Sequence, residues 1–246
     1  MNNIPIDLVV PIYNEGERVI QLLEHFQLHI KNKYRVLLCY DLSDDNIFQY
    51  KNNFKKFNFE VVLVKNPLRG PSAAIKEGLY YGKSDCVIVY PADDFLNINI
   101  IDKMYDAFSL NNNDIVVASR FMKGGSMKGC PLIKEILART ASTTLYLLSS
   151  IPVRDASNGF RLFSRRLLNT VEIESKVGFA YSIELLAKCN RLNLKIAEIP
   201  AQWEERIEGV SRFKIYKWIP QYLKWYFYGL STTWLKKSPQ DVKKRI

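Results

Sequence analysis

Cysteine is scarce in this sequence of 246 residues, and its four cysteines are far apart. No two of them form a Cys-x-x-Cys pair, so a small scaffold held together by disulfides is excluded. The first two lie beside apolar runs that are typical of buried strands. Reduced, structural thiols in a cytosolic protein are the prediction for Cys39, Cys86, Cys130 and Cys189.

Long hydrophobic runs are also missing. Nowhere do about eighteen uncharged apolar residues follow one another, which is the length that a membrane-spanning helix needs. The N-terminus has neither the basic region nor the apolar stretch of a signal peptide. The chain is therefore expected to be neither secreted nor membrane-spanning, and its predicted location is the cytoplasm. With 48% hydrophobic residues it can bury one good core, which excludes disorder.

Histidine occurs only twice. His25 and His29 are four residues apart on a predicted helix, a spacing that can bind zinc, but no third ligand accompanies them. An exposed helix face is the better interpretation of this pair.

Positive charge is distributed unevenly. The net charge is +10, and the segment from Arg206 to the end holds ten Lys and Arg against Glu208 and Asp241, which is +8 of that total. A basic tail can bind nucleic acid. Because the tail has no signature of a nucleic-acid-binding fold, such a module is only a second alternative function, and no nucleic acid partner is expected.

Apolar, β-branched runs alternate with helix-like segments in the first half of the chain. This alternation predicts βαβ units and an α/β fold with a mostly parallel central sheet flanked by helices. The expected strands are 6–12, 34–40, 60–64, 86–90 and 115–119. The expected helices are 15–28, 45–57, 71–81 and 98–110. In such a fold the working edge lies at the carboxyl ends of the strands.

The alternation stops after residue 119. The predictions for the second half are a loop at 124–129, a long helix at 131–148, a turn and short strand at 155–163, a helix at 178–191 and a strand at 195–201. No linker rich in Gly, Ser or Pro separates the halves, so a single domain is expected. The second half would then form the other side of one shared cleft.

Two adjacent carboxylates, Asp93 and Asp94, follow the end of the predicted strand 86–90. Carboxylates are hard oxygen ligands for Mg²⁺ or Mn²⁺, and a cation there would bridge a diphosphate. The alternative is that one of the two carboxylates caps the following helix. The segments 10–15, 41–45 and 66–74 would open on the same sheet edge, which favours a binding site.

Several motifs occur in one order along the chain. They are Pro-x-Tyr-Asn-Glu at 11–15, Asp-x-Ser-x-Asp at 41–45, the acidic pair, and Ala-Ser-Arg-Phe at 118–121. Together they resemble glycosyltransferase family 2 with the GT-A fold. The segments 154–163, 178–184 and 206–213 are similar to its dolichyl-phosphate mannose synthase branch. The resemblance covers residues 6–213, and the joint order of the motifs is specific although each motif alone is weak.

The resemblance implies a GT-A domain over 1–212, with a nucleotide-sugar half at 1–120 and an acceptor half at 121–212, followed by a basic aromatic helical tail at 213–246. The implied ligands of the donor, a GDP- or UDP-sugar, are Pro11, Tyr13, Glu15, Asp41, Arg69, Asp93 and Arg120. The implied metal ligands are Asp93 and Asp94. The residues implied to bind phosphates and the acceptor are Arg139, Ser142, Arg206, Ser211 and Arg212. Guanidinium groups and hydroxyls suit phosphate oxygens.

Two positions depart from the family pattern. Pro91 stands at the first acidic place of the Asp-x-Asp signature, so Asp94 would have to substitute as a ligand. Tyr40 stands where a carboxylate usually precedes Asp41. A catalytically weak or inactive relative that binds a nucleotide sugar is therefore the first alternative function.

The implied reaction transfers a sugar, with inversion, to a polyprenyl phosphate or to a hydroxyl of a glycan or lipid, in cell-envelope or glycan biosynthesis. Its expected catalytic residues are Asp93, Asp155 and Arg139. A lipid phosphate is already an anion, whereas a hydroxyl needs a base. Asp155 is the candidate for that base or for positioning the acceptor, and the alternative is an Asx turn with Ser157 and Asn158.

Residues 213–234 combine nine aromatic side chains with interspersed lysines, a composition typical of a helix at a membrane interface. The predicted partner is an anionic membrane surface, with the protein peripheral on its cytoplasmic face. Pro220 is expected to split the segment into two helical pieces. The alternative is that the aromatic rings pack back on the domain, and a mixture of the two is expected.

Overall fold

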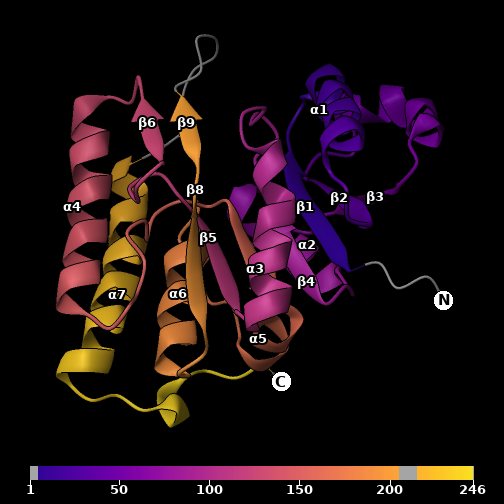
Figure 1. The fold of residues 1–246 in the computed structure, drawn as a ribbon. Helices are drawn as coiled ribbons and strands as arrows, with labels where there is room; N and C mark the ends of the chain where they lie inside the picture. The colour runs from indigo at the N-terminus through magenta and orange to yellow at the C-terminus, as the bar shows by residue number, and fades with distance from the viewer. Residues whose placement is uncertain (1–4, 205–214, 246) are drawn as a thin grey trace.

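A seven-stranded sheet with helices on both faces organises the protein (Figure 1). The computed structural model describes residues 5–204 and 215–245. The strands of the sheet, in the order β3-β2-β1-β4-β7-β5-β8, are Glu60–Lys65, Tyr34–Tyr40, Ile6–Ile12, Cys86–Val89, Arg161–Ser164, Ile115–Ser119 and Ile196–Pro200. Neighbouring strands are parallel, except that β7 is antiparallel to β4 and β5. The predicted α/β fold with a mostly parallel sheet is confirmed.

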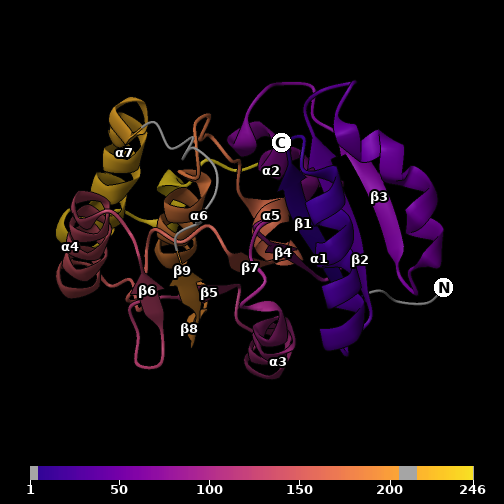
Figure 2. The same ribbon diagram turned by 90° about the horizontal axis from the view of Figure 1, so that it is seen from above.

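Alternation along β1 explains why the sheet has a core on each face. Ile6, Leu8 and Val10 pack in one core with α1 (Gly16–His29) and α3 (Ile101–Asn111), whereas Val9 belongs to the other core. The helices of that second core are α2 (Pro71–Tyr81), α5 (Arg165–Thr170) and α6 (Tyr181–Arg191). Figure 2 shows α1 and α3 on one side of the sheet and α2, α5 and α6 on the other.

Two local predictions differ from the structure. The helix expected at 45–57 is a 3-10 helix, η1 (Asn46–Lys56), and a second 3-10 turn, η2 (Ile98–Ile100), precedes α3. The loop expected at 124–129 contains a short strand, β6 (Ser126–Lys128), which pairs in parallel with β9 (Gln202–Glu204). Three residues carry too little local pattern to predict a strand, and the partner strand lies about 75 residues further along the chain.

Two long helices, α4 (Leu132–Leu148) and α7 (Ile215–Trp234), lie side by side at the end of the sheet beyond β8 (Figures 1 and 2). Trp225 of α7 is 1% exposed and packs against α6, where Lys188 lies 4.9 Å from its ring. The Tyr226 hydroxyl donates to Thr144 Oγ1 on α4 (2.8 Å). Phe227 and Trp234 are mostly exposed. The packing part of the expected mixture is therefore confirmed for Trp225 and Tyr226, whereas the membrane-interface part stays a prediction for Phe227 and Trp234.

The expected break at Pro220 is wrong, because α7 is one continuous helix over 20 residues with this proline inside it. A proline in a helix interior removes one hydrogen bond and costs about 3 kcal/mol. Burial of the Trp225 side chain against α6 offsets a cost of this size. Tertiary packing therefore overrides the local propensity.

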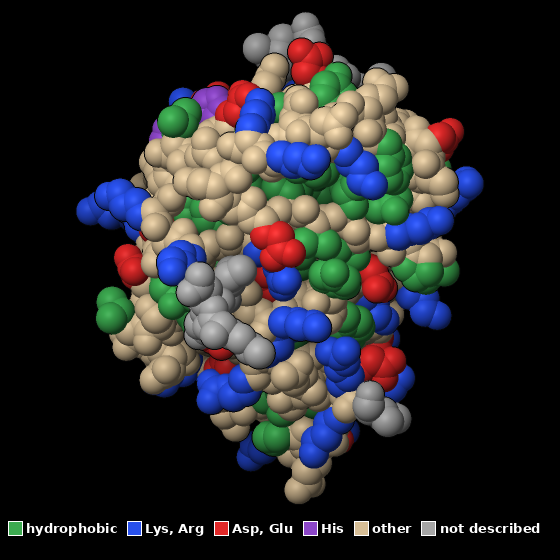
Figure 3. All heavy atoms as spheres, turned by 90° about the vertical axis from the view of Figure 1, so that its right-hand side faces the viewer, with side chains coloured by type: hydrophobic (Ala, Val, Ile, Leu, Met, Phe, Trp, Pro, Cys, Tyr) green, Lys and Arg blue, Asp and Glu red, His purple; other side chains and the backbone are tan. Residues whose placement is uncertain are grey.

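The chain returns to the body of the domain after α7. A short turn, η3 (Pro239–Asp241), leads to the buried side chain of Val242, and Lys244 forms an antiparallel bridge with Val171. No helix in the described ranges is both long and apolar enough to cross a bilayer. Figure 3 views the side on which β3 lies and shows basic and acidic side chains interspersed there. Positive charge is thus not confined to the C-terminal segment.

Candidate active site

The turn between β1 and α1 is held by side chains that follow β2. The backbone N–H of Asn14 donates to Asp45 Oδ2 (2.9 Å), and that of Gly16 donates to Asn46 Oδ1 (2.8 Å). Asn14 has a φ of 53°, in the left-handed region that asparagine tolerates better than most residues. These bonds fix the part of the chain that carries Tyr13 and Glu15. A hollow of about 610 Å³ adjoins the turn and is lined by residues 14–18, Gln21, Asn46, Tyr50 and Phe95.

Asp41, at the end of β2, organises the loop that leads into α2. Its carboxylate accepts hydrogen bonds from Asn66 Nδ2 (2.8 Å) and from the backbone N–H of Gly70 (2.7 Å). Gly70 has a φ of 100°, which favours glycine at this position. The neighbouring Arg69 is exposed and lines a smaller hollow of about 190 Å³ together with Lys176 and other residues. Asp41 and Arg69 therefore belong to one loop system.

The two adjacent carboxylates after β4 have different surroundings. Asp94 Oδ1 accepts the backbone N–H groups of Leu96 and Asn97 (2.9 and 3.0 Å), and its Oδ2 accepts Asn97 Nδ2 (2.7 Å). Burial raises the pKa of Asp94, and the bonds from Asn97 and Leu96 oppose that shift. The expectation of Asp94 as a metal ligand does not fit this arrangement, because the carboxylate caps the turn before η2. Asp94 thus holds the turn that leads into η2, but it does not cap the following helix as the alternative expected, because the N-cap residues of η2 and α3 are Asn97 and Ile100.

Asp93 lies beside the start of α1. Its carbonyl oxygen accepts a long hydrogen bond from Arg18 Nη2 (3.4 Å), and its side chain is partly exposed. No group of three or more His, Cys, Asp or Glu side chains that could hold a metal ion occurs within residues 5–204 and 215–245. A cation bound by the partly exposed Asp93 would take its other ligands from phosphate oxygens or water.

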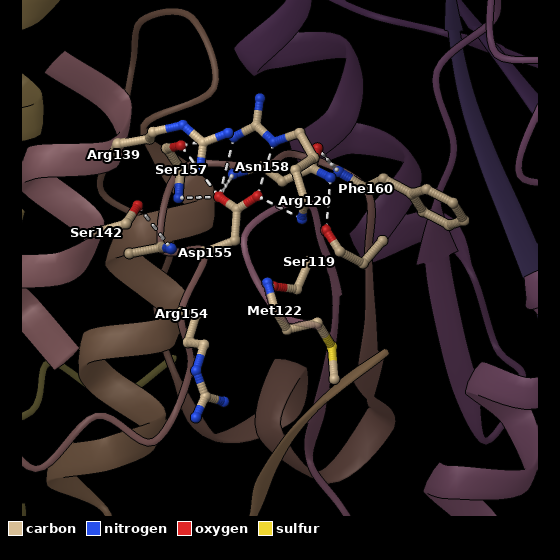
Figure 4. Close-up of polar contacts among 12 residues, drawn as sticks. Ser119, Arg120, Met122, Arg139, Ser142, Arg154, Asp155, Ser157, Asn158 and Phe160 are labelled. Carbon is tan, nitrogen blue, oxygen red and sulfur yellow. Dashed lines mark hydrogen bonds and ion pairs between the residues drawn. The ribbon is translucent and has the colours of Figure 1, made fainter. Parts of the chain in front are cut away.

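Arg120 and Asp155 form a buried ion pair at the end of β5 (Figure 4). Asp155 Oδ2 accepts Arg120 Nε (2.7 Å) and the Arg120 backbone N–H (3.0 Å), and its Oδ1 accepts Arg120 Nη2 (2.9 Å). The same Oδ1 accepts the backbone N–H groups of Ser157 and Asn158 (both 3.1 Å). The alternative of an Asx turn at Asp155 is therefore confirmed.

The base role considered for Asp155 is not supported by these contacts. The side chain is fully buried, and both oxygens are occupied by donors. Burial alone would raise the pKa of Asp155, but the charge and hydrogen bonds of Arg120 lower this pKa to about 2. A carboxylate with such a low pKa is a weak proton acceptor at neutral pH. Asp155 instead holds the Arg120 guanidinium in place.

Arg139 reaches toward the same place from α4 (Figure 4). Its Nε donates to Glu135 Oε1 one turn earlier (2.7 Å), and 47% of its side chain is exposed. Among the residues that the structure describes, neither Arg120 Nη1 nor the two Nη groups of Arg139 have a hydrogen-bond partner. No group within residues 5–204 and 215–245 therefore competes with an anion for these three nitrogens.

Ser142 does not face this open side. It is fully buried, and its Oγ accepts the backbone N–H of Ala156 (3.1 Å), so it joins α4 to the Asx turn. The expectation that its hydroxyl binds phosphate does not fit this burial. Pro11 and Glu15 are partly exposed and Tyr13 is exposed at the edge of the sheet. Three further expected phosphate ligands, Arg206, Ser211 and Arg212, lie outside the described residues.

A family model described as glycosyl transferase family 2 matches residues 7–171, which is most of the chain. The chain belongs to glycosyl transferase family 2. This family 2 member is therefore a glycosyltransferase, as the motifs predicted, and its matched range contains Asp41, Arg69, Asp93, Arg120 and Asp155.

Two relatives of this family 2 glycosyltransferase have names that specify an acceptor. A dolichyl-phosphate beta-glucosyltransferase of Trichomonas vaginalis is 27% identical over 224 residues, covering 85% of this chain and 68% of the relative. A dolichol-phosphate mannosyltransferase of Pyrococcus furiosus is 23% identical over 229 residues, covering 89% of this chain and 64% of the relative. The chain thus spans about two thirds of the length of these relatives.

Solved structures confirm the GT-A fold. Glucosyl-3-phosphoglycerate synthase of Mycobacterium tuberculosis in complex with UDP superimposes with a TM-score of 0.63 at 17% identity, covering 90% of this chain and 80% of that chain. A complex of the same enzyme with Mn²⁺, UDP and phosphoglyceric acid gives a TM-score of 0.63 at 18% identity, covering 90% of this chain and 78% of that one. At this identity the likeness concerns the fold alone.

Sequence reasoning missed two residues that shape the site of this family 2 glycosyltransferase. Asp45 lies in the quoted Asp-x-Ser-x-Asp motif, but only Asp41 received a role. Arg161 is fully buried in β7 and donates to three carbonyl oxygens, those of Asn158, Ser182 and Asp155. An arginine between Phe160 and Leu162 in an apolar strand is a signal, because a buried charge has to be paired and hydrogen-bonded.

Proposed function

We propose that this glycosyltransferase transfers a hexose from a GDP- or UDP-sugar to a polyprenyl phosphate, with inversion at the anomeric carbon. The observation that carries the proposal is the pair of guanidinium groups of Arg120 and Arg139, three of whose terminal nitrogens have no hydrogen-bond partner among the described residues. The reaction has to bring together two anions, the donor diphosphate and the acceptor phosphate. Paired arginines reduce the repulsion between them and bind phosphate oxygens in a bidentate way.

The names of the relatives support this class of acceptor. The Trichomonas and Pyrococcus relatives are named for transfer to dolichyl phosphate. The M. tuberculosis synthase, which shares the fold, was crystallised with UDP and with Mn²⁺ or Mg²⁺. These names support a nucleotide-sugar donor, a divalent cation and a lipid-phosphate acceptor as the proposal for this chain, in glycan or cell-envelope biosynthesis.

The surroundings of Asp155 favour a phosphate over a hydroxyl as the acceptor. A sugar hydroxyl has to lose a proton during attack, which needs a carboxylate within hydrogen-bond reach. Asp155 has both oxygens occupied by Arg120 and a pKa of about 2. A lipid phosphate needs no base, because it is already an anion. Asp155 therefore acts in this proposal by holding Arg120 in position to bind phosphate.

Asp93 is the residue that would hold Mg²⁺ or Mn²⁺. Mg²⁺ in nucleotide sites is commonly bound by one or two carboxylates together with substrate phosphates, so a single carboxylate fits. Asp94 has its oxygens committed to the turn before η2. When bound, the cation would neutralise charge on the departing diphosphate. The orientation of donor and acceptor would still come from the arginines and from the loops held by Asp41 and Asp45.

The outer side chains of α4 and α7 support attachment to a membrane surface. Large apolar side chains on both helices are exposed, among them Leu132, Ile133, Leu147, Leu223, Phe227 and Trp234. Lys236 and Lys237 are exposed on the same part of the chain, and ammonium groups are attracted to anionic headgroups. We place the protein peripherally on the cytoplasmic face, where its acceptor would be embedded in the bilayer.

The test uses the purified chain with dolichyl phosphate or undecaprenyl phosphate in detergent, UDP-glucose or GDP-mannose, and Mg²⁺ or Mn²⁺. Formation of a glycosylated lipid phosphate, measured with radiolabelled donor, is the expected result. Nucleotide-sugar binding by calorimetry without product from any acceptor would instead favour the catalytically weak relative suggested by Pro91 and Tyr40. Transfer to a glycan hydroxyl but to no lipid phosphate would overturn the proposed acceptor.

A further inference from the structure

Phe121 follows Arg120 at the end of β5, and its ring contacts both arginines of the site. The guanidinium carbon of Arg120 lies 5.0 Å from the centre of the ring, and that of Arg139 lies 4.6 Å from it. We propose that Phe121 is a positioning residue that holds these two guanidinium groups at one anion site and thereby sets its affinity for diphosphate. This inference rests on the proposed function, because it assigns a role within the same phosphate site.

The two arginines are held very differently by the rest of the protein. Arg120 has little freedom, because Nε and Nη2 donate to Asp155 and Nη2 also donates to Ser157 Oγ (2.7 Å). Arg139 is half exposed, and Glu135 on the same helix is its one ion-pair partner among the described residues. Among the described residues, the ring of Phe121 is therefore the contact that links Arg139 of α4 to the fixed guanidinium at the end of β5.

Electrostatics explains why an aromatic ring suits this position. Two guanidinium groups close together repel each other, and no carboxylate contacts both of them among the described residues. The face of an aromatic ring carries negative partial charge and attracts cations within about 6 Å. Phe121 can thus hold both cations together before an anion arrives. A carboxylate in its place would neutralise the site and compete with phosphate.

The shared ring also limits how far apart the two guanidinium groups can lie. The two guanidinium carbons can be no more than 9.6 Å apart, since each lies within 5.0 Å and 4.6 Å of the same ring centre. Charge-assisted hydrogen bonds from a guanidinium to a phosphate oxygen are about 2.7–2.9 Å long. In this proposal one anion accepts bonds from Arg120 Nη1 and from the Nη groups of Arg139 at once.

The experiment compares wild type, Phe121→Leu and Phe121→Tyr by calorimetric binding of inorganic pyrophosphate, UDP and GDP, and by kcat and KM for the donor. We expect Phe121→Leu to weaken pyrophosphate binding roughly three- to tenfold, whereas Phe121→Tyr, which keeps the ring, stays within about twofold of wild type. Tyr146→Leu is the matched control, because Tyr146 lies on α4 and stacks with Arg154 (5.0 Å) away from the pair. It should leave pyrophosphate binding unchanged.

A double-mutant cycle with Arg139→Met separates positioning from general support of the fold. If Phe121 acts through Arg139, Phe121→Leu should cost much less pyrophosphate affinity in the Arg139→Met background than in wild type. Equal losses in both backgrounds, or unchanged pyrophosphate binding by Phe121→Leu, would overturn the inference. Phe121→Met, which is unbranched and has no ring, replaces Phe121→Leu if the latter fails to fold. A wild-type protein that binds no diphosphate at all would instead show that the proposed function is wrong.

Discussion

Asp155 binds Arg120 through both carboxylate oxygens, with Nε 2.7 Å from Oδ2 and Nη2 2.9 Å from Oδ1. The carboxylate is fully buried, and a second arginine, Arg161, is buried beside it and donates to the Asp155 carbonyl oxygen (3.2 Å). Burial lowers the pKa of Arg161 to about 10, so this group still carries its charge at neutral pH. One carboxylate thus compensates two buried cations, and the site retains a net positive charge beneath the proposed phosphate position.

Replacing Asp155 with Asn should destabilise the protein strongly. The change removes the negative partner of a buried arginine, and breaking a buried pair in this way costs about 3–5 kcal/mol. Urea unfolding followed by circular dichroism measures the loss. The control is Glu24→Gln, which removes the exposed pair with Lys56 and should cost under about 1 kcal/mol. Equal losses for the two variants would contradict the structural role given to Asp155.

The ion pair also predicts how stability depends on pH. The pKa of Asp155 is about 2 in the folded protein, against an ordinary value of 3.8, so its contribution is fully present above pH 4. This contribution is lost as the pH falls from about 4 toward 2, because the carboxylate of Asp155 binds a proton at a higher pH in the unfolded chain than in the folded protein. A shift of this size corresponds to about 2 kcal/mol. Urea unfolding of wild type and Asp155→Asn at several pH values from 7 to 3 should show converging stabilities, and parallel curves would contradict the prediction.

Asp93→Asn and Asp94→Asn should have different effects. Asp93→Asn removes the proposed ligand, so turnover should lose its dependence on Mg²⁺ or Mn²⁺ and fall at least about tenfold, while the melting temperature stays near that of wild type. Asp94→Asn weakens the cap of the turn before η2 and should cost about 1 kcal/mol of unfolding free energy. The measurements are metal titrations of donor turnover and thermal melts. Normal metal-dependent turnover by Asp93→Asn would show that the metal site is misplaced.

Replacing exposed apolar side chains on α7 should weaken membrane binding. Phe227 and Trp234 are 59% and 64% exposed, and transferring such a side chain into lipid contributes about 1.5–3 kcal/mol. We expect the variant Phe227→Asp with Trp234→Asp to sediment at least tenfold less with vesicles that contain phosphatidylserine. Leu110→Asp on α3 is the matched control, because Leu110 is 79% exposed on another helix. An equal loss with the control, or no loss with the double variant, would argue against this surface.

The strands of the sheet and the order of the elements along the chain could be predicted from local sequence patterns. Apolar β-branched runs and the turn residues between them located β1, β2 and β5 to the residue, because each strand is defined by its own composition. The motif residues Asp41 and Asp93 were located at strand ends for the same reason. The roles of Asp94 and Ser142 could not be predicted in this way. Their hydrogen-bond partners decide whether these side chains face a ligand or the protein, and residue type alone does not reveal those partners.

Composition and periodicity alone determined that this chain folds as an α/β protein and that its polar strand ends meet at one edge, since these follow from residues close together in sequence. Only the tertiary structure decided that Asp155 binds Arg120, which lies 35 residues away in the sequence, that β6 pairs with β9, and that α7 continues through Pro220. Each of these depends on burial and on contacts between distant segments. Such contacts form only when the whole chain has packed, and their free energy then outweighs the local preference.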